Sequence, residues 1–216
     1  LYGMHFHPPF YKRLFESYGL QVFFYQNCWF RRVADPLDQR FFTAHQKISS
    51  RGGFTAEMVK KDNLEKYAKD FVTIYNSAWA SHEGNKEMTL DAAVKIFNTM
   101  KPVMDEKIAW FAYYKGDPVA MYINLPDLNE IFGKFNGRFG LLEKLRFLWF
   151  QKFTGFTKMV GIIFGVVPRF QGLGLDYFLI VEAAKIIQQS RYQTSELQWQ
   201  GDFHPKMNNI SKKLGF

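Results

Sequence analysis

This chain of 216 residues is 47% hydrophobic and 22% charged, which excludes a disordered protein and allows a core of one domain or slightly more. No apolar run reaches the ~20 residues that span a bilayer, no basic-then-apolar leader opens the chain, and the single Cys28 excludes intrachain disulfides and cysteine-rich metal sites, so we expect a cytoplasmic protein. The formal charge of +8 suits a polyanionic ligand, a nucleic acid or an anionic membrane surface, and does not choose among them.

The first half of the chain contains an expected strand, a linker and two helices. Residues 20–32 are rich in aromatic and apolar side chains, which favours a strand. Residues 35–55 contain Pro36 with several serines and glycines, so we expect a linker there and place the main domain boundary in it. Apolar side chains then recur at helical spacing over residues 64–79, and Thr89 caps a second helix.

Two apolar runs in the middle of the chain predict a β-hairpin. They cover residues 108–114 and 119–125, and the turn sequence Lys115-Gly116-Asp117-Pro118 stands between them. Residues 139–153 then carry an apolar stripe at helical spacing, with lysines and arginines beside it. Such a helix can lie on a membrane surface, but we expect this one to pack on its own protein, because two further phenylalanines intervene.

A strand, a glycine turn and a helix follow, and they predict an anion site. The apolar residues 159–167 suit a buried strand that Pro168 ends, and helical spacing resumes after the turn. Gly172 and Gly174 let backbone N–H groups point inward at a helix N-terminus, where the dipole favours an anion, although Gly-x-Gly alone can be a simple tight turn. The dinucleotide fingerprint does not match, because Tyr177 replaces a third glycine, and no Gly-Lys-Ser/Thr triplet of a nucleotide-triphosphate loop occurs.

The end of the chain resembles a segment near its start. A strand over residues 194–200 precedes a helix over residues 205–214, which Gly215 ends. The segment 203–216 begins Phe-His-Pro and closes Leu-Gly-Phe, and the segment 6–20 begins Phe-His-Pro and closes Tyr-Gly-Leu. Both predict a helix that starts at proline and ends at glycine, and we favour an internal repeat over a chance likeness.

The glycine turn resembles a known motif. Val-x-Pro-x-Phe-Gln-Gly-x-Gly, starting at Val166, is similar to motif A of the GNAT superfamily of acyl-CoA N-acyltransferases, whose Gln/Arg-x-x-Gly-x-Gly/Ala loop binds the pyrophosphate of coenzyme A. The resemblance implies acetyl-CoA or another acyl-CoA as cofactor. The residues that it assigns to this cofactor are Gly165, Val166, Val167, Gln171, Gly172, Leu173, Gly174, Leu175, Asp176 and His204. Asp176 departs from the pattern, which has a small residue there, and His204 could equally cap its helix, which we favour.

The resemblance also implies direct attack of an amine on the acyl thioester, without a covalent enzyme intermediate. Glu196, on the strand that follows the motif, is the candidate base, and an ion-paired or solvated glutamate is an equal reading. Ser211 stands where the family often has a tyrosine that acts as general acid. His82, Asn124 and Asp127 would lie on loops beside the acceptor cleft and select the amine.

The order of the elements and the repeat together predict the architecture. The resemblance implies an α/β fold with a central mixed, mostly antiparallel sheet flanked by helices. Residues 1–45 would be the C-terminal tail of a preceding GNAT-like lobe with its linker, and residues 54–216 an acyltransferase domain that lacks its last strand. The chain would then be the latter part of a tandem protein, and the open sheet edge would favour a homodimer.

Three classes of function remain. The first is an N-acyltransferase, with acetyl as the expected acyl group and an unidentified small-molecule or peptide amine as acceptor. The second is a catalytically weak acyl-CoA-binding or scaffold module of the same fold, which Ser211 and Asp176 keep open. The third is a nucleic-acid binder, but no recognition motif supports it and the lysines are spread along the chain, so we expect no nucleic-acid partner.

Overall fold

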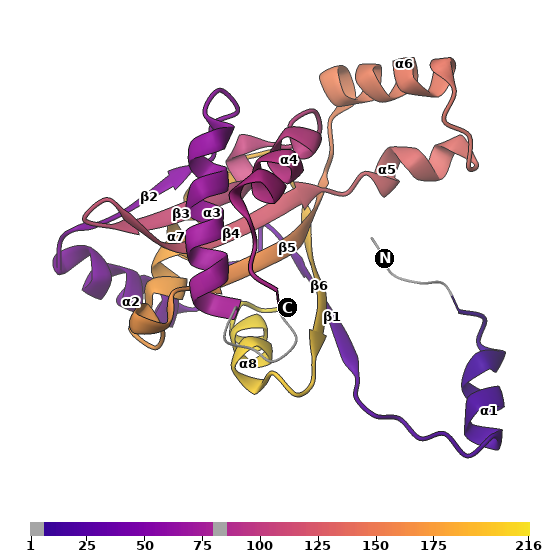
Figure 1. Ribbon diagram of the computed structural model, residues 1–216, viewed down its shortest axis with the longest axis horizontal. Coiled ribbons are helices and arrows are strands. Elements are labelled where there is room, and N and C mark those ends of the chain that lie inside the picture. The colour runs from indigo at the N-terminus through magenta and orange to yellow at the C-terminus, as the bar shows by residue number, and fades with distance from the viewer. Residues whose placement is uncertain (1–6, 80–85) are drawn as a thin grey trace.

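The computed structural model describes residues 7–79 and 86–216, and its centre is a six-stranded sheet (Figure 1). The strand order is β1-β6-β5-β4-β3-β2, and all neighbours are antiparallel except β5 and β6, which are parallel. The strands are β1 Gln26–Arg32, β2 Phe54–Met58, β3 Ala109–Tyr114, β4 Asp117–Pro126, β5 Lys158–Val166 and β6 Thr194–Gly201. The predicted mixed, mostly antiparallel sheet is confirmed.

Helices cover both faces of this sheet. The described residues form α1 Phe10–Ser17, α2 Gln39–Ser50, α3 Leu64–Trp79, α4 Leu90–Met100, α5 Asn129–Phe132, α6 Leu141–Trp149, α7 Leu175–Ile187 and α8 Pro205–Lys213. Of these, α3 and α4 cover one face of the sheet, and α2 and α7 cover the other. Side chains alternate along β3, so Phe111 packs under α3 and α4 while Trp110 faces α2 and α7 on the other side. A strand buried on both faces reads as a continuous apolar run, which is the pattern of residues 108–114. None of the helices in the described ranges is long and apolar enough to cross a membrane.

The predicted hairpin, β3 and β4, and the two predicted helices before it, α3 and α4, lie where the sequence predicts them. Thr89 Oγ1 accepts a hydrogen bond from Ala92 N at 3.3 Å, which caps α4. Tyr114 pairs with Asp117 across a turn of two residues, Lys115 and Gly116, and both have positive φ angles of 52° and 91°. This is the type I′ geometry that matches the twist of a β-hairpin.

The linker predicted over residues 35–55 is wrong, because this segment forms α2 and β2. Asp38 Oδ1 accepts a hydrogen bond from Arg40 N at 2.8 Å and caps α2, and Phe41 and Ile48 are fully buried. The turn residues that suggested a linker stand only at the two ends of this helix. β2 then pairs with β3, so a strand of the sheet lies in the segment that the sequence pattern indicated as a linker.

β1 forms the edge of the sheet beside β6, and it is shorter than the strand predicted over residues 20–32. Phe30 pairs with Glu196 and Gln26 with Gly201. Arg31, which is 7% exposed, donates hydrogen bonds from its guanidinium to the carbonyl oxygens of Leu214 and Asp35. The strand that we attributed to a preceding lobe therefore completes the sheet formed by the rest of the chain and is tied to the end of α8.

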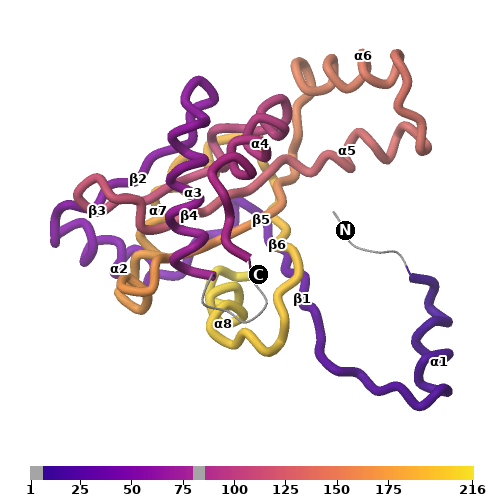
Figure 2. The backbone as a smooth tube through the Cα atoms, viewed as in Figure 1, coloured from indigo at the N-terminus to yellow at the C-terminus, as the bar shows by residue number. Residues whose placement is uncertain are grey.

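The two similar segments at the ends of the chain form helices that end in the same way. Leu20 N donates to Phe15 O at 3.1 Å after α1, and Phe216 N donates to Ser211 O at 3.2 Å after α8. The glycine before each donor has a positive φ, which is usual at such helix ends. The surroundings differ, because α1 has no buried residue and lies apart from the sheet (Figure 2). An origin of the two helices in two lobes stays a prediction.

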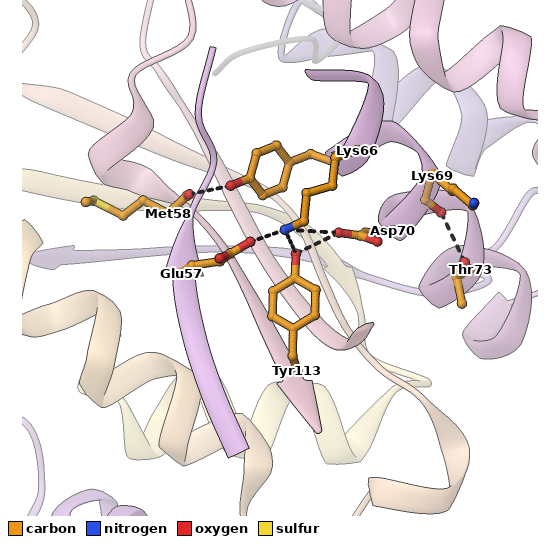
Figure 3. A network of polar contacts seen from close by, with 8 residues as sticks. Glu57, Met58, Lys66, Lys69, Asp70, Thr73 and Tyr113 are labelled. Carbon is orange, nitrogen blue, oxygen red and sulfur yellow. Dashed lines mark hydrogen bonds and ion pairs between the residues drawn. The ribbon is translucent and has the colours of Figure 1, made fainter. Parts of the chain in front are cut away.

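Lys66 joins β2, β3 and α3 through a network of polar contacts (Figure 3). Its Nζ contacts a carboxylate oxygen of Glu57, lies 3.6 Å from Asp70 Oδ2 and donates to Tyr113 OH at 2.9 Å. Tyr113 OH donates to Asp70 Oδ2 at 2.6 Å. Burial raises the pKa of Glu57, but the hydrogen bond and charge of Lys66 outweigh it, so this pKa lies below its usual value. The network clamps the edge strand β2 to the helix above it.

We expect Lys66→Met to lower the free energy of unfolding by about 1 kcal/mol at neutral pH, because Glu57 and Asp70 lose the cation between them and both partners are partly solvated. The pKa of Glu57 is lowered in the folded state, so its stabilisation is present above the unfolded pKa and is lost as the pH falls through the folded one. The difference from wild type should therefore shrink below about pH 4.5. Urea unfolding at several pH values measures it. Lys69→Met on the exposed side of the same helix is the control, and an equal loss there would contradict the network.

The aromatic segment 139–153 was expected to pack on its own protein, and it does so through one side only. It forms α6 and one π-helical turn, Phe150–Thr154, and extends from the sheet together with α5 (Figure 1). Phe147 and Phe150 are buried, but the leucines of the stripe are exposed. The sequence pattern predicted the helix correctly and did not indicate what covers its apolar side.

Candidate acyl-CoA binding site

The two parallel strands in the middle of the sheet separate half-way along their length. β5 and β6 pair from Lys158 with Thr194 to Gly161 with Leu197, and no pair between them follows. At this point Ile162 is an extra residue on β5, because Ile123 pairs with Ile163 while Asn124 pairs with Gly161. Such a bulge bends a strand and increases its twist. Beyond it, β5 keeps its bonds to β4, while the backbone on its other edge faces the opening.

A cavity of about 530 Å³ fills this opening, and a second of about 270 Å³ adjoins it. Trp79 of α3, Phe164 of β5, Trp199 of β6 and Met207 of α8 form apolar parts of the wall. Six of the predicted cofactor residues line the larger cavity, namely Gly165, Val166, Gln171, Gly172, Asp176 and His204. The sequence analysis did not find Trp79, Trp199 or Met207, because helical and strand spacing do not tell which element faces a distant one.

The predicted glycine turn closes one end of the larger cavity. Gly172 and Gly174 have φ angles of +73° and +90°, which a residue with a Cβ adopts only under strain. Gln171 Nε2 donates to Val166 O at 3.0 Å, so this side chain holds the turn against the end of β5. Gly174 is the N-cap of α7 and offers no side-chain cap. The carboxyl of Asp176 interacts with the N–H groups of Asp176 and Tyr177, which leaves those of Gly174 and Leu175 for an anion.

Solved structures with the same fold include acyltransferases. A GCN5-related glucosamine N-acetyltransferase region of a fungal multi-domain β-N-acetylglucosaminidase matches with a TM-score of 0.50 and 10% identity, over 88% of this chain and 20% of that chain. The chain has the GNAT fold. A GCN5-related N-acetyltransferase from Sphaerobacter thermophilus has a TM-score of 0.49 and 13% identity, over 88% of this chain and 47% of that chain.

One curated protein shows sequence similarity to this chain. It is a bacterial ceramide synthase from Caulobacter vibrioides, which is 22% identical over 177 residues, or 79% of this chain and 46% of that protein. The chain thus spans about half the length of this relative. No protein-family profile matches the chain.

Gly165, on the part of β5 that borders the opening, allows a close contact with Trp79. A Cβ at this position would lie 2.4 Å from Trp79 Cη2, well inside contact distance. The indole at the end of α3 therefore lies directly against the backbone of β5. This glycine has a packing reason of its own, besides the role that the family resemblance implies.

His204 does not cap α8, contrary to the reading that we favoured. It occupies the N-cap position, but its side chain makes no capping hydrogen bond. Its ring lies beside Phe203, with 4.4 Å between the centroids, and borders the larger cavity. Pro205 at the first helical position needs no partner for its nitrogen, so the cap is less necessary here. The imidazole therefore borders the cavity and does not cap the helix.

Glu196 and Ser211 do not line either cavity. Glu196 pairs with Val160, in the part of the sheet where β5 and β6 are still joined, and its Oε1 is buried without a hydrogen-bond partner among the described residues. Ser211 is fully buried, and its single hydroxyl proton has Gln200 Oε1 at 3.0 Å and Met207 O at 3.2 Å as acceptors. This arrangement serves the packing of α8 on β6. The catalytic roles of both residues stay predictions.

The residues predicted to select the acceptor are dispersed. Asn124 lies inside β4 and not on a loop; it is fully buried and its Nδ2 donates to Ile108 O at 2.8 Å. Asp127 follows β4 at the start of the α5 region, where its Oδ1 accepts from Asn129 N at 3.0 Å. His82 lies outside the described residues. Asn124 therefore lies in the core of the sheet, with its Nδ2 bonded there and its Oδ1 buried without a hydrogen-bond partner among the described residues.

Asp176 places a carboxyl group in the cavity at the N-terminus of α7. Burial raises the pKa of Asp176, and the backbone N–H groups of Tyr177 and of Asp176 itself oppose this shift only in part. Because the folded pKa is raised, the stabilising form is the neutral one; its contribution is present below the unfolded pKa and is lost as the pH rises through the folded pKa. A bound phosphate would disfavour the ionised form further.

We therefore expect Asp176→Asn to bind coenzyme A about three- to tenfold more tightly than wild type at neutral pH, because one negative charge near the phosphates is removed. The fold should lose no stability at that pH. Titration calorimetry at neutral and at mildly acidic pH measures the effect, which should diminish as the wild-type carboxyl becomes protonated. Weaker binding by the variant would show that Asp176 supports the site and does not oppose the ligand.

Proposed function

We propose that this protein transfers an acyl group from acyl-CoA to an amine. The observation that carries the proposal is the separation of β5 and β6 beside an uncapped glycine turn, which gives a cavity with an unpaired strand edge at its side and an anion site at its end. The strand edge suits a chain of amide groups, and the turn suits a pyrophosphate. Such a pair of features in one cavity fits the pantetheine and diphosphate parts of coenzyme A.

The residues of this chain would act on a bound donor and amine as follows. The free edge of β5 at Gly165 and Val166 would hold the pantetheine arm, and a backbone N–H group there would stabilise the thioester oxygen. Val167 N is not available, because it donates to Val119 O at 2.9 Å. The N–H groups at Gly174 and Leu175, with the ammonium of Lys206 at the cavity wall, would bind phosphate. An amine attacks only when neutral, so its ammonium form, with a pKa near 10, must lose a proton. We propose a ring nitrogen of His204 as the acceptor of this proton, beside the earlier candidate Glu196.

We further propose that one of the two substrates is a long-chain, apolar molecule. The cavity walls carry Trp79, Phe164, Trp199, Met207 and Ile210, which suit a hydrocarbon chain better than a polar metabolite. The curated relative is named a ceramide synthase, and this name supports a lipid amine, or a long acyl chain, over acetyl transfer to a small polar amine. Because acyl-CoA is the donor, we place the reaction on the cytoplasmic side of the cell.

The function is tested by assaying release of coenzyme A from acetyl-, octanoyl- and palmitoyl-CoA with a panel of amines that includes a long-chain amino alcohol. We expect turnover with the longer donors or with the lipid amine. His204→Gln should lower kcat at least about tenfold while donor affinity changes little. Glu196→Gln is assayed in parallel. A fall in kcat in Glu196→Gln alone would identify Glu196 as the residue that accepts the proton. Binding of donors without turnover of any amine would contradict the enzymatic proposal.

An acyl-CoA-binding module without catalysis is the second candidate. The burial of Ser211 favours it, because the hydroxyl at the position of the family's general acid cannot reach a leaving thiolate in the cavity. In this case coenzyme A should raise the thermal stability of the protein, while none of the amines gives a product. His204→Gln would then not change any rate, because the wild type has no turnover.

A further inference from the structure

The α5–α6 arm, residues 129–154, presents an apolar surface that the described chain does not cover. The arm leaves the sheet after β4 and returns at β5, and in the view of Figures 1 and 2 it extends away from the sheet. Seven apolar side chains on it are between 52% and 76% exposed, namely Phe139, Leu141, Leu142, Leu145, Leu148, Trp149 and Phe153. A contiguous group of this kind on a protein surface indicates a contact with another apolar phase.

The surface is one stripe on an ordered helix. At 3.6 residues per turn, the exposed leucines of α6 and Trp149 fall within an arc of about 120°. The other side of the helix belongs to the buried core beside the sheet, where Phe147 lies 5.6 Å from Phe132 and Phe150 lies 5.2 Å from Phe156, measured between ring centroids. These contacts fix the arm with the stripe outward.

Basic side chains accompany the stripe. The arm contains five basic residues, Lys134, Arg138, Lys144, Arg146 and Lys152, and two acidic ones. Both acidic side chains serve the backbone, because Glu130 accepts from Thr157 N and Lys158 N, and Glu143 accepts from Gly140 N. Within the described residues none of the five cations forms an ion pair. On the helix, Lys144 and Arg146 stand at the two borders of the apolar arc.

We propose that the α5–α6 arm binds to the surface of a membrane that contains anionic lipids. The leucines and Trp149 enter the boundary between headgroups and acyl chains, while Lys144 and Arg146 extend to the lipid phosphates on either side. The proposal does not depend on acyl transfer.

The charges of the arm distinguish this occupant from others. A second copy of the chain, docked by the same stripe, would bring the same cations opposite one another, which repel. A nucleic acid would satisfy the cations but leave the leucines in water. An anionic bilayer is complementary to both the cations and the apolar stripe.

Vesicle flotation with the full chain tests the proposal. Vesicles of phosphatidylcholine alone are compared with an equimolar mixture of phosphatidylcholine and phosphatidylglycerol. We expect binding to the mixed vesicles that is about tenfold or more tighter and that weakens with salt. Leu145→Glu/Trp149→Glu should abolish it, and these residues are exposed, so the fold should persist. Leu90→Glu/Ile96→Glu on α4, two partly exposed apolar residues away from the arm, is the matched control and should still bind.

Three results would overturn the proposal. Vesicle binding that survives Leu145→Glu/Trp149→Glu would place the membrane contact elsewhere on the protein. Self-association without vesicle binding, abolished by the same variant in sedimentation velocity, would assign the stripe to a second copy. A monomer that binds neither kind of vesicle would leave the stripe to a protein partner. If Leu145→Glu/Trp149→Glu loses helical circular dichroism, Lys144→Glu/Arg146→Glu takes its place in the flotation test. This variant should lose only the preference for vesicles that contain anionic lipid.

Discussion

Replacement of Gly174 by glutamate is expected to lower the affinity for coenzyme A at least about a hundredfold, which is about 2.8 kcal/mol. Gly174 has a φ of +90°, and a Cβ there would lie 3.4 Å from the Cβ of Ala44 on α2. The variant therefore strains the turn that aims the N–H groups of α7, at a cost of about 1–2 kcal/mol. It also places a carboxylate where a phosphate would bind. Titration calorimetry with coenzyme A measures the loss.

Gly52→Glu is the matched control for this variant. Gly52 also has a positive φ, +70°, and open space around its Cβ position, but it lies in the turn between α2 and β2. Gly52→Glu introduces the same charge and a similar backbone strain away from the cavity. The Gly52→Glu protein should therefore bind coenzyme A with the affinity of the wild type. Equal losses in both variants would mean that strain or net charge, and not the glycine turn, accounts for the effect.

Arg31→Met is expected to lower the free energy of unfolding by about 2–4 kcal/mol. The guanidinium of Arg31 is buried and donates to the carbonyl oxygens of Leu214 and Asp35, which join β1 to the end of α8. Methionine keeps much of the side-chain volume but leaves these carbonyl groups without that donor in a site with little water. Urea unfolding, followed by circular dichroism, measures the change.

Arg32→Met on the same strand is the control. Arg32 points to solvent, with a side chain that is 75% exposed and an ion pair to Asp35 at 3.1 Å. Exposed pairs of this kind contribute at most about 1 kcal/mol. A loss of the same size in both variants would show that β1 is stabilised by its charge in general and not by the buried guanidinium.

The parts of the fold that the sequence predicts well are those with a local cause. The helix over residues 64–79, the two-residue turn at Lys115 and Gly116, and the strand and glycine turn around Pro168 all lie where spacing, glycine and proline place them. The position of β1 beside β6 has no local cause, because strand propensity does not name a partner. The helix α2 was not found because the turn residues at its ends dominate a short and weakly patterned segment.

The candidate site also has parts that the sequence predicts and parts that it does not. The turn with Gly172 and Gly174 could be found from sequence, since its geometry depends on the residues of the turn itself. Glu196 was chosen because it lies on the strand after the motif, but β5 and β6 separate only after Leu197. Glu196 therefore stays in the closed part of the sheet, while Gln198, two residues further along, lines the smaller cavity. Register between strands depends on long-range packing and could not be predicted.

The position of β1 has a consequence for the order in which the chain can fold. Residue 30 pairs with residue 196, so the strand that is synthesised early waits for β6, which is synthesised late. Before β6 has been synthesised, β1 has no strand to pair with, and it stays exposed in the growing polypeptide together with the aromatic residues before it. Contacts so distant in sequence also slow folding, because a long loop must close before they form. We therefore expect refolding to end with a slow step in which β1 joins the sheet, and chaperones that bind exposed aromatic segments to act on this protein during synthesis.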